Sequence, residues 1–276
     1  MIKQTILAIA FATLATSLSA QDYITFDLGG GLQNISFKND QGDKKVGFGF
    51  DTQLGYRHFF NDNWGAGIGV GFKTFAGKTT VNFNHNEQNG EDPAILAEHK
   101  ERNYLTEYSS VEEKVKLSAV DIPIGGYYQR SFNDKWSMCA GLNIFVTIAA
   151  SSKFESESGN VTVRAEYPSY KQTAQDVPAH GLGTYSGFSG SPDLKKLAVG
   201  LGAEYTMYYA LSDCLDLGMG ISGAYRFSDL KNQNFESLYD EDARTYNGIT
   251  QSKLCDAVRL VNLTATVGIR YHLPSK

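Results

Sequence analysis

The sequence predicts an all-β fold, because bulky and small residues alternate over long stretches of the chain. In residues 46–60 the even positions are mostly bulky, from Val46 to Phe60, and the odd positions are mostly glycine or polar. Residues 64–72 repeat the pattern, with glycine at every odd position. A period of two is the period of a β-strand. The tripeptide Asn61-Asp62-Asn63 between the two stretches is typical of a turn.

The first 20 residues form a separate segment of a different kind. Lys3 is followed by an apolar run from Ile6 to Ala12 and then by small residues up to Ala20, as in a secretory signal peptide. Cleavage after Ser19 is an alternative because Leu18 is bulky. We therefore predict a signal peptide over 1–20 and one barrel domain over 21–276. Beyond residue 20, no apolar run approaches the roughly 20 residues of a membrane helix.

Period-two segments recur along the whole chain. They lie near residues 26–32, 46–60, 64–72, 120–128, 136–146, 197–209, 215–225 and 261–271. Short polar turns at 61–63, 133–135 and 212–214 alternate with mostly long polar connections near 38–45, 77–114, 152–194 and 229–255. An even strand number with this asymmetry predicts an eight-stranded antiparallel up-and-down transmembrane β-barrel with long outer loops and short periplasmic turns.

The two faces of the predicted strands differ in size. One face carries aromatic and aliphatic side chains, and the other carries glycine and small residues where a soluble strand would present Lys, Glu and Thr to water. Small side chains suit the narrow lumen of an eight-stranded barrel. We therefore place the bulky face in lipid, in preference to a soluble lipocalin-like barrel.

Aromatic residues gather beside the short turns. Phe-Asn-Asp-x-Trp occurs twice, at 60–64 and 132–136, which places a tryptophan directly after each turn. Such a collection predicts an aromatic girdle at one membrane interface. Its predicted members are Tyr56, Phe60, Trp64, Tyr128, Trp136, Tyr205, Tyr209 and Tyr271.

The stretch "DIPIGGYYQRSFNDKW", the repeated strand-turn-strand units and the terminal "TATVGIRYHL" resemble the OmpA-like and PorT-like eight-stranded outer-membrane β-barrel proteins over the whole mature chain. The resemblance implies an outer-membrane location and assembly by the barrel-insertion machinery, which would read the last strand. The outward residues of that strand are Leu263, Ala265, Val267, Ile269, Tyr271 and Leu273. The tail "LPSK" departs from the family, which often ends on an aromatic residue. The peptidoglycan-binding domain of many relatives is not expected.

Charged residues of both signs fall on the predicted inward face. They are Asp51, Arg57, Lys73, Asp121, Glu204, Asp216, Arg226 and Arg270. Unpaired charges in a confined lumen would be costly, so we expect an ion-paired plug. Counting from the nearest short turn gives a lower layer of Arg57, Asp216 and Arg270 and an upper layer of the other five. A narrow ion path is the alternative.

Other chemistry is weakly represented. The net charge of -5 gives no basic excess for nucleic acid. The five histidines are dispersed, without a G-x-S-x-G or H-E-x-x-H motif, so we predict no enzyme, no cofactor and no metal. His85 and His99 in an acidic loop are interpreted as solvated surface. The cysteine number is odd, and a Cys139–Cys214 bond is compatible with the predicted strands.

The predicted function is structural or surface-interacting, with the long outer loops as the working part. The expected partners are outer-membrane lipid and lipopolysaccharide, the barrel-insertion machinery and an unidentified extracellular ligand. Loop aromatic residues suit contact surfaces; they are Phe83, Tyr104, Tyr108, Tyr167, Tyr170, Tyr239 and Tyr246. The alternatives are a barrel enzyme acting on envelope lipid, a narrow-conductance channel, and loops that only form a hydrated cap.

Overall fold

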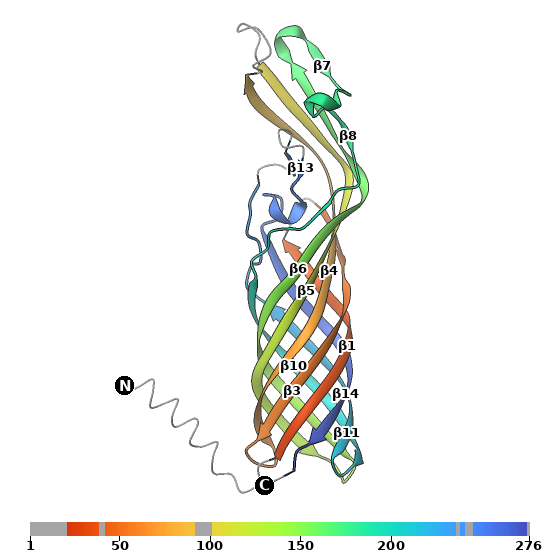
Figure 1. Ribbon diagram of the computed structural model, residues 1–276, viewed down its shortest axis with the longest axis vertical. Helices are drawn as coiled ribbons and strands as arrows, with labels where there is room; N and C mark the ends of the chain where they lie inside the picture. Colours follow the sequence, from red (N-terminus) through yellow and green to blue (C-terminus); the bar gives the residue numbers. More distant parts are fainter. Residues whose placement is uncertain (1–20, 39–41, 92–100, 236–237, 241–244, 275–276) are drawn as a thin grey trace, which may run out of the picture.

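A computed structural model describes residues 21–38, 42–91, 101–235, 238–240 and 245–274 of the protein. The predicted signal peptide, residues 1–20, lies outside this range. Antiparallel strands form a tall barrel whose long axis is vertical in Figure 1. The eight strands of the ring are β1 (Gln21–Lys38), β3 (Phe48–Phe59), β4 (Trp64–Glu91), β5 (Glu101–Ser131), β6 (Trp136–Tyr167), β10 (Leu197–Ser212), β11 (Leu215–Arg226) and β14 (Ala257–His272).

Each ring strand pairs with the ring strand next to it in the chain, and β1 pairs with β14 to close the barrel. The predicted fold class is therefore confirmed. The described chain begins and ends beside the short turns, since Gln21 pairs with Phe59 and the Leu273 amide donates to the Asp22 carbonyl at 2.8 Å. Among the described residues, no helix is long and apolar enough to cross a membrane.

The barrel is apolar outside and polar inside. Large side chains such as Phe26, Ile68, Leu142 and Ile221 are exposed on the outer surface. Their neighbours in sequence point into the lumen, where glycines and charged residues lie. The predicted assignment of the two faces is correct in this part of the molecule.

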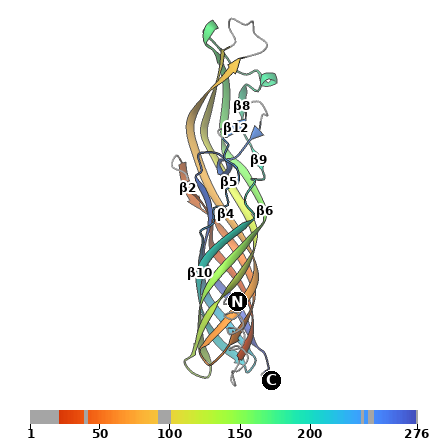
Figure 2. The same cartoon turned by 90° about the vertical axis from the view of Figure 1, so that its left-hand side faces the viewer.

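Three strands continue far beyond the ring, where long loops were predicted. β4, β5 and β6 contain 28, 31 and 32 residues, whereas a tilted strand needs only about 9–11 residues to cross the hydrocarbon. Figures 1 and 2 show them rising together above the other strands of the ring. The prediction of loops over 77–114 and the first part of 152–194 was thus wrong: β4 pairs with β5 up to Glu91, and β5 pairs with β6 up to Glu166.

Shorter elements pack along these extensions. We use the term distal domain for residues 77–91 of β4, 101–117 of β5 and 153–167 of β6, together with the described residues of 168–194 and 228–256. β2 (Gly42–Val46) pairs with β4, while β7 (Gln172–Ala174), β8 (Gly183–Tyr185) and β9 (Ser189–Gly190) pair with β6. The other elements are η1 (Pro168–Tyr170), η2 (Pro178–His180), β12 (Tyr239–Asp240), β13 (Thr245–Tyr246) and η3 (Ile249–Gln251). Residues 39–41 and 92–100 of the predicted loops lie outside the described residues.

The distal domain has an apolar core. Val81, Val111 and Val161 are fully buried there together with Tyr104 and Tyr108. These two tyrosines were predicted as exposed contact residues, and that prediction was wrong because they face the inner side of the extended sheet. Tyr246 also packs against the core, and Tyr170 is exposed as predicted.

Candidate functional site

The barrel lumen holds all eight charged residues that were predicted to point inward. The lowest group lies near the short turns. Arg270 Nε donates to Asp216 Oδ2 at 2.7 Å, and His272 Nε2 lies 2.7 Å from the same oxygen. Arg270 also donates to Ser137 Oγ at 2.9 Å, and its guanidinium stacks 3.9 Å from the centre of the Tyr208 ring. Asp216, Arg270 and His272 also line an open pocket at the short-turn end of the barrel. This group separates that pocket from the rest of the lumen.

The middle group is built around Arg57 on β3. Its terminal nitrogens donate to Glu204 Oε1 at 2.5 Å and to the Tyr208 hydroxyl at 3.2 Å, and the Cys139 sulfur lies 3.5 Å away. The guanidinium lies 4.4 Å from the centre of the Tyr127 ring. A cation held between an acid and two phenol rings fills the cross-section of a narrow barrel.

The upper group contains two acids and two bases. Arg226 donates to Asp121 at 2.5 Å, and Lys73 donates to Asp51 at 2.7 Å and lies 3.8 Å from Asp121. Arg226 and Asp121 are completely buried. The Arg226 guanidinium also lies 5.0 Å from the centre of the Phe145 ring. Each charge in this group therefore has a partner of opposite sign, as burial at low dielectric requires.

The vertical arrangement differs from the predicted two layers. Glu204 was assigned to the upper layer and Arg57 to the lower one, yet they form a direct pair. Counting from the turns ignored the tilt of the strands, which shifts residues of equal count to different heights on different strands. The eight charges thus form three groups and not two.

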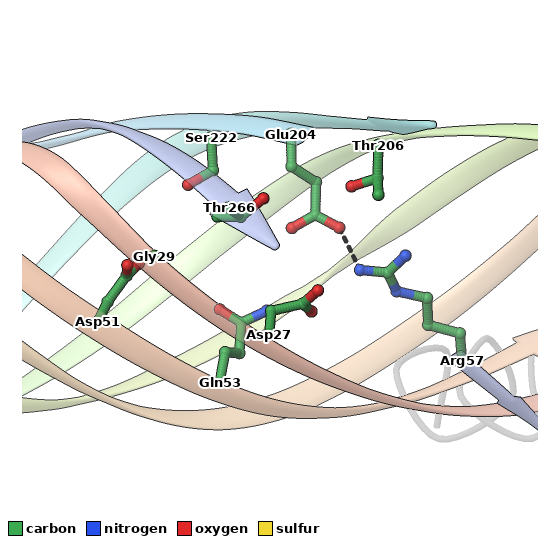
Figure 3. Close-up of a pocket in the computed structure, with 9 residues that line it drawn as sticks. All are labelled: Asp27, Gly29, Asp51, Gln53, Arg57, Glu204, Thr206, Ser222 and Thr266. Carbon is green, nitrogen blue, oxygen red and sulfur yellow. Dashed lines mark hydrogen bonds and ion pairs between the residues drawn. The ribbon is translucent and has the colours of Figure 1, made fainter. Parts of the chain in front are cut away.

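One lumen acid was missed by the sequence analysis. Asp27 lines a cavity of about 20 Å³ between the middle and upper groups, together with Asp51, Arg57 and Glu204; Figure 3 shows Asp27 beside the pair of Arg57 and Glu204. A space of this size holds about one water molecule. Gly29 also lines it, and a Cβ there would lie 2.1 Å from Asp51 Oδ1, so glycine leaves room for that carboxylate. The signal for Asp27 was its inward parity in the first strand.

An apolar cluster covers the upper group. Phe75, Leu117 and Phe154 continue the inward faces of β4, β5 and β6, and Leu230 and Leu260 pack against them. All five side chains are buried. Residues 229–255 were predicted to form a polar connection, so this cluster was not predicted from the sequence. The described lumen is therefore filled by charge groups below and by an apolar cap above.

The predicted girdle residues lie on the outer surface near the short turns. Trp64 pairs with Tyr128 across β4 and β5, with ring centres 5.0 Å apart, and Trp136 pairs with Tyr209 at 4.9 Å. Exposed rings that pair across strands at one height suit a membrane interface. The other members are Tyr56, Phe60, Tyr205 and Tyr271.

The outer face of the distal domain carries a ladder of ion pairs. Lys78 bonds Glu112 at 3.2 Å and also pairs with Glu157, which binds Lys114 at 3.1 Å. Hydrogen bonds from Lys78 and then Lys114 lower the pKa of Glu157 to about 2. Hydrogen bonds from Lys45 and Lys78 lower the pKa of Glu112. This face is charged and faces water.

The cysteines and candidate metal ligands form no site in the described chain. Cys139, Cys214 and Cys255 are all free. The suggested Cys139–Cys214 bond is therefore not formed, because Cys139 is buried in the lumen while Cys214 lies exposed in a turn. In residues 21–274, apart from the undescribed segments, no group of three or more His, Cys, Asp or Glu is placed to hold a metal. His99 of the acidic loop lies outside the described residues.

Comparison with known proteins places this geometry in a family. The family model of the outer membrane protein beta-barrel domain matches residues 6–247. A search of curated proteins finds no match. Among solved structures, OprG from Pseudomonas aeruginosa is 12% identical with a TM-score of 0.42, covering 94% of this chain and 99% of its own.

Two further structures are similar at the same low level. Neisserial surface protein A (NspA) is 12% identical with a TM-score of 0.37, covering 92% of this chain and 98% of its own. Ail of Yersinia pestis, solved with the heparin analogue sucrose octasulfate, is 12% identical with a TM-score of 0.35, covering 93% and 100%. The family model spans most of the chain, so the protein belongs to the outer membrane protein beta-barrel domain family.

Proposed function

We propose that the protein is a closed outer-membrane barrel that anchors the distal domain at the cell surface, where this domain makes structural or ligand-binding contacts. The main support for this proposal is that β4, β5 and β6 run without interruption from the barrel wall into the distal domain. A rigid sheet fixed to a membrane anchor positions a binding surface more precisely than separate flexible loops would. The proposal assigns the protein no catalytic role.

The contents of the lumen support the closed barrel. Three ion-pair groups occupy successive heights, and Phe75, Leu117 and Phe154 lie above them. Ions would have to pass buried Arg–carboxylate pairs and then an apolar cluster, both of which are high barriers to a hydrated ion. Measurement of conductance separates this proposal from the narrow-channel alternative.

The membrane partners follow from the outer face and the family. Residues 1–20 act as the signal peptide in this proposal. Lipid contacts the apolar face, and lipopolysaccharide surrounds the base of the distal domain. The insertion machinery recognises β14, whose outward Leu263, Val267, Ile269 and Tyr271 are exposed. The lipid-acting enzyme has no specific arrangement in its favour.

The test separates assembly from binding. Residues 79–113, 154–190 and 231–255 are replaced together by short turns, and the truncated and full-length proteins are displayed on cells. Folding is followed by the shift in electrophoretic mobility on heating, and binding by arrays of glycans and matrix proteins. We expect normal barrel assembly with loss of every contact that the full-length protein makes. Equal binding by the truncated barrel would place the working surface in the barrel and contradict the proposal.

A further inference from the structure

One carboxyl group of the distal domain lies on the apolar side of the sheet. Glu113 on β5 is completely buried. Its neighbour Glu112 points to the opposite face, where it pairs with Lys45 at 2.6 Å and Lys78 at 3.2 Å. The two adjacent acids therefore experience opposite environments, one apolar and one aqueous and basic.

Residues 245–256 pass directly over Glu113. The backbone N–H of Ile249 donates to Glu113 Oε2 at 2.9 Å. Gly248 has a φ of +84°, and a Cβ at this position would lie 3.4 Å from the same oxygen. Glycine thus permits both the left-handed backbone and the close approach to the carboxyl group.

The rest of the pocket gives a carboxylate little compensation. Neither Glu113 Oε1 nor the Tyr246 hydroxyl makes a hydrogen bond of good geometry, although Tyr246 lies close enough to oppose the rise in the pKa of Glu113. The Tyr246 ring is held between Phe188, stacked at 4.5 Å, and Phe154, edge-on at 5.7 Å. A proton on Oε1 would turn this buried acceptor into a donor beside the Tyr246 hydroxyl.

We propose that Glu113 is a pH-sensitive latch, which holds residues 245–256 closed over the outer end of the barrel when protonated and loosens them when ionised. The latch is independent of what the distal domain binds. Release would uncover the apolar cap, because Cys255 of the same segment packs with Phe75 and Leu117 in that cluster.

The electrostatics agree with this geometry. Burial raises the pKa of Glu113 to about 7 from the ordinary 4.5, against the opposing effect of hydrogen bonds that include the Ile249 amide. The closed segment therefore retains a proton that the open segment would release. Closure is strongest at acidic pH, weakens as pH rises from about 4.5 through 7, and changes little above that range.

Two neighbouring titratable groups, Tyr246 and Cys255, do not titrate in the same range. Burial and then Glu113 raise the pKa of Tyr246 well above its ordinary value, and Tyr108 lies beyond it as a further contributor. Burial raises the pKa of Cys255 to about 11. Lys231 lies outside residues 245–256 and donates to the backbone carbonyls of Ser252 and Cys255 in that segment.

The experiment measures hydrogen exchange of amides 248–256 in the full-length protein in lipid nanodiscs at pH 5.5 and 8.5, corrected for intrinsic exchange rates. The linkage between a pKa of 4.5 in the open state and about 7 in the closed state predicts about a 30-fold loss of protection at the higher pH. Glu113→Gln, which cannot ionise, should show no such loss. The control Glu112→Gln should behave as the wild type, and amides of β11 should be unchanged.

Two results would overturn the latch: protection of 248–256 in the wild type that does not depend on pH, or the same dependence in Glu113→Gln. If Glu113→Gln fails to fold, infrared titration of isotope-labelled glutamate in the wild type measures the ionisation of Glu113 instead. A buried carboxyl band with a midpoint near pH 7 supports the latch. Titration of all glutamates below pH 5 refutes it.

Discussion

The barrel and the distal domain share three strands, β4, β5 and β6, but the chemical character of the two faces of these strands is inverted between them. In the barrel part of β4, Lys73 is buried and Phe72 is exposed. A few residues later on the same strand, Phe75 is buried and Lys78 lies on the outer, charged face. In β4 the alternation is unbroken from Lys73 to Lys78, yet the chemical character of the two faces is exchanged.

β5 makes the same change in the opposite chain direction. Leu117 is buried in the distal domain while Lys116 points outward to Glu155. Further along, Asp121 is buried in the lumen while Ile124 is exposed. Because the alternation of β5 is unbroken from Leu117 to Ile124, we attribute the exchange to the surroundings: we expect lipid to give way to water outside, while a polar lumen gives way to an apolar core inside. We expect the outer boundary of the membrane to lie at this exchange.

The largest expected effect comes from removing one partner of the innermost ion pair. Asp121→Ala leaves Arg226 buried without its carboxylate, which should cost about 3–5 kcal/mol in the free energy of unfolding. The matched control is Glu155→Ala, since Glu155 pairs with Lys116 at 3.7 Å with both side chains more than half exposed. That change should stay within about 0.5 kcal/mol. Denaturant unfolding in bilayers measures both, and equal effects would contradict the contrast between lumen and surface.

A second pair of changes tests the inversion of the outer face. Leu142 is 73% exposed midway along the barrel part of β6, so Leu142→Arg should cost about 2–4 kcal/mol if lipid surrounds it. The reverse change, Lys116→Leu in the distal domain, should alter the free energy of unfolding by no more than about 0.5 kcal/mol. Tolerance of Leu142→Arg would mean that this face contacts water.

The smallest expected effect concerns the ion-pair ladder. The pKa of Glu157 is lowered to about 2 from 4.5, so its stabilising contribution is present above pH 4.5 and is lost as pH falls toward 2. Exposure to water keeps this contribution small. Glu157→Gln should abolish that part of the pH dependence, and high salt should reduce it in the wild type. Thermal melting of the distal domain followed by tyrosine fluorescence measures the effect, and an unchanged acid profile in Glu157→Gln would argue against the ladder.

The same inversion explains what could be predicted from the sequence. The barrel strands were predictable because their bulky residues keep one parity and tight turns join them. The distal strands keep the same period, with Val111, Val115 and Leu117 on one face, but their other face is Lys and Glu. The outward residues are no longer apolar in the distal part, so the strands were predicted to end there and the rest was interpreted as loop.

The lumen residues were predictable from parity, but their pairing was not. Arg57 and Glu204 are 147 residues apart in the chain, and their meeting depends on the tilt of strands that do not pair directly. The burial of Glu113 could not be predicted for the same reason. It depends on residues 245–256, and no short-range pattern in the sequence places them beside β5.

The central claim, a barrel closed by ion pairs and an apolar cap, is tested most directly by single-channel recording in planar lipid bilayers. The purified full-length protein is inserted at neutral pH in concentrated KCl, with a known porin as the positive control. The account predicts no resolvable steady current, because Arg226–Asp121 and the groups around it fill the lumen. A stable open channel in most insertions would contradict it.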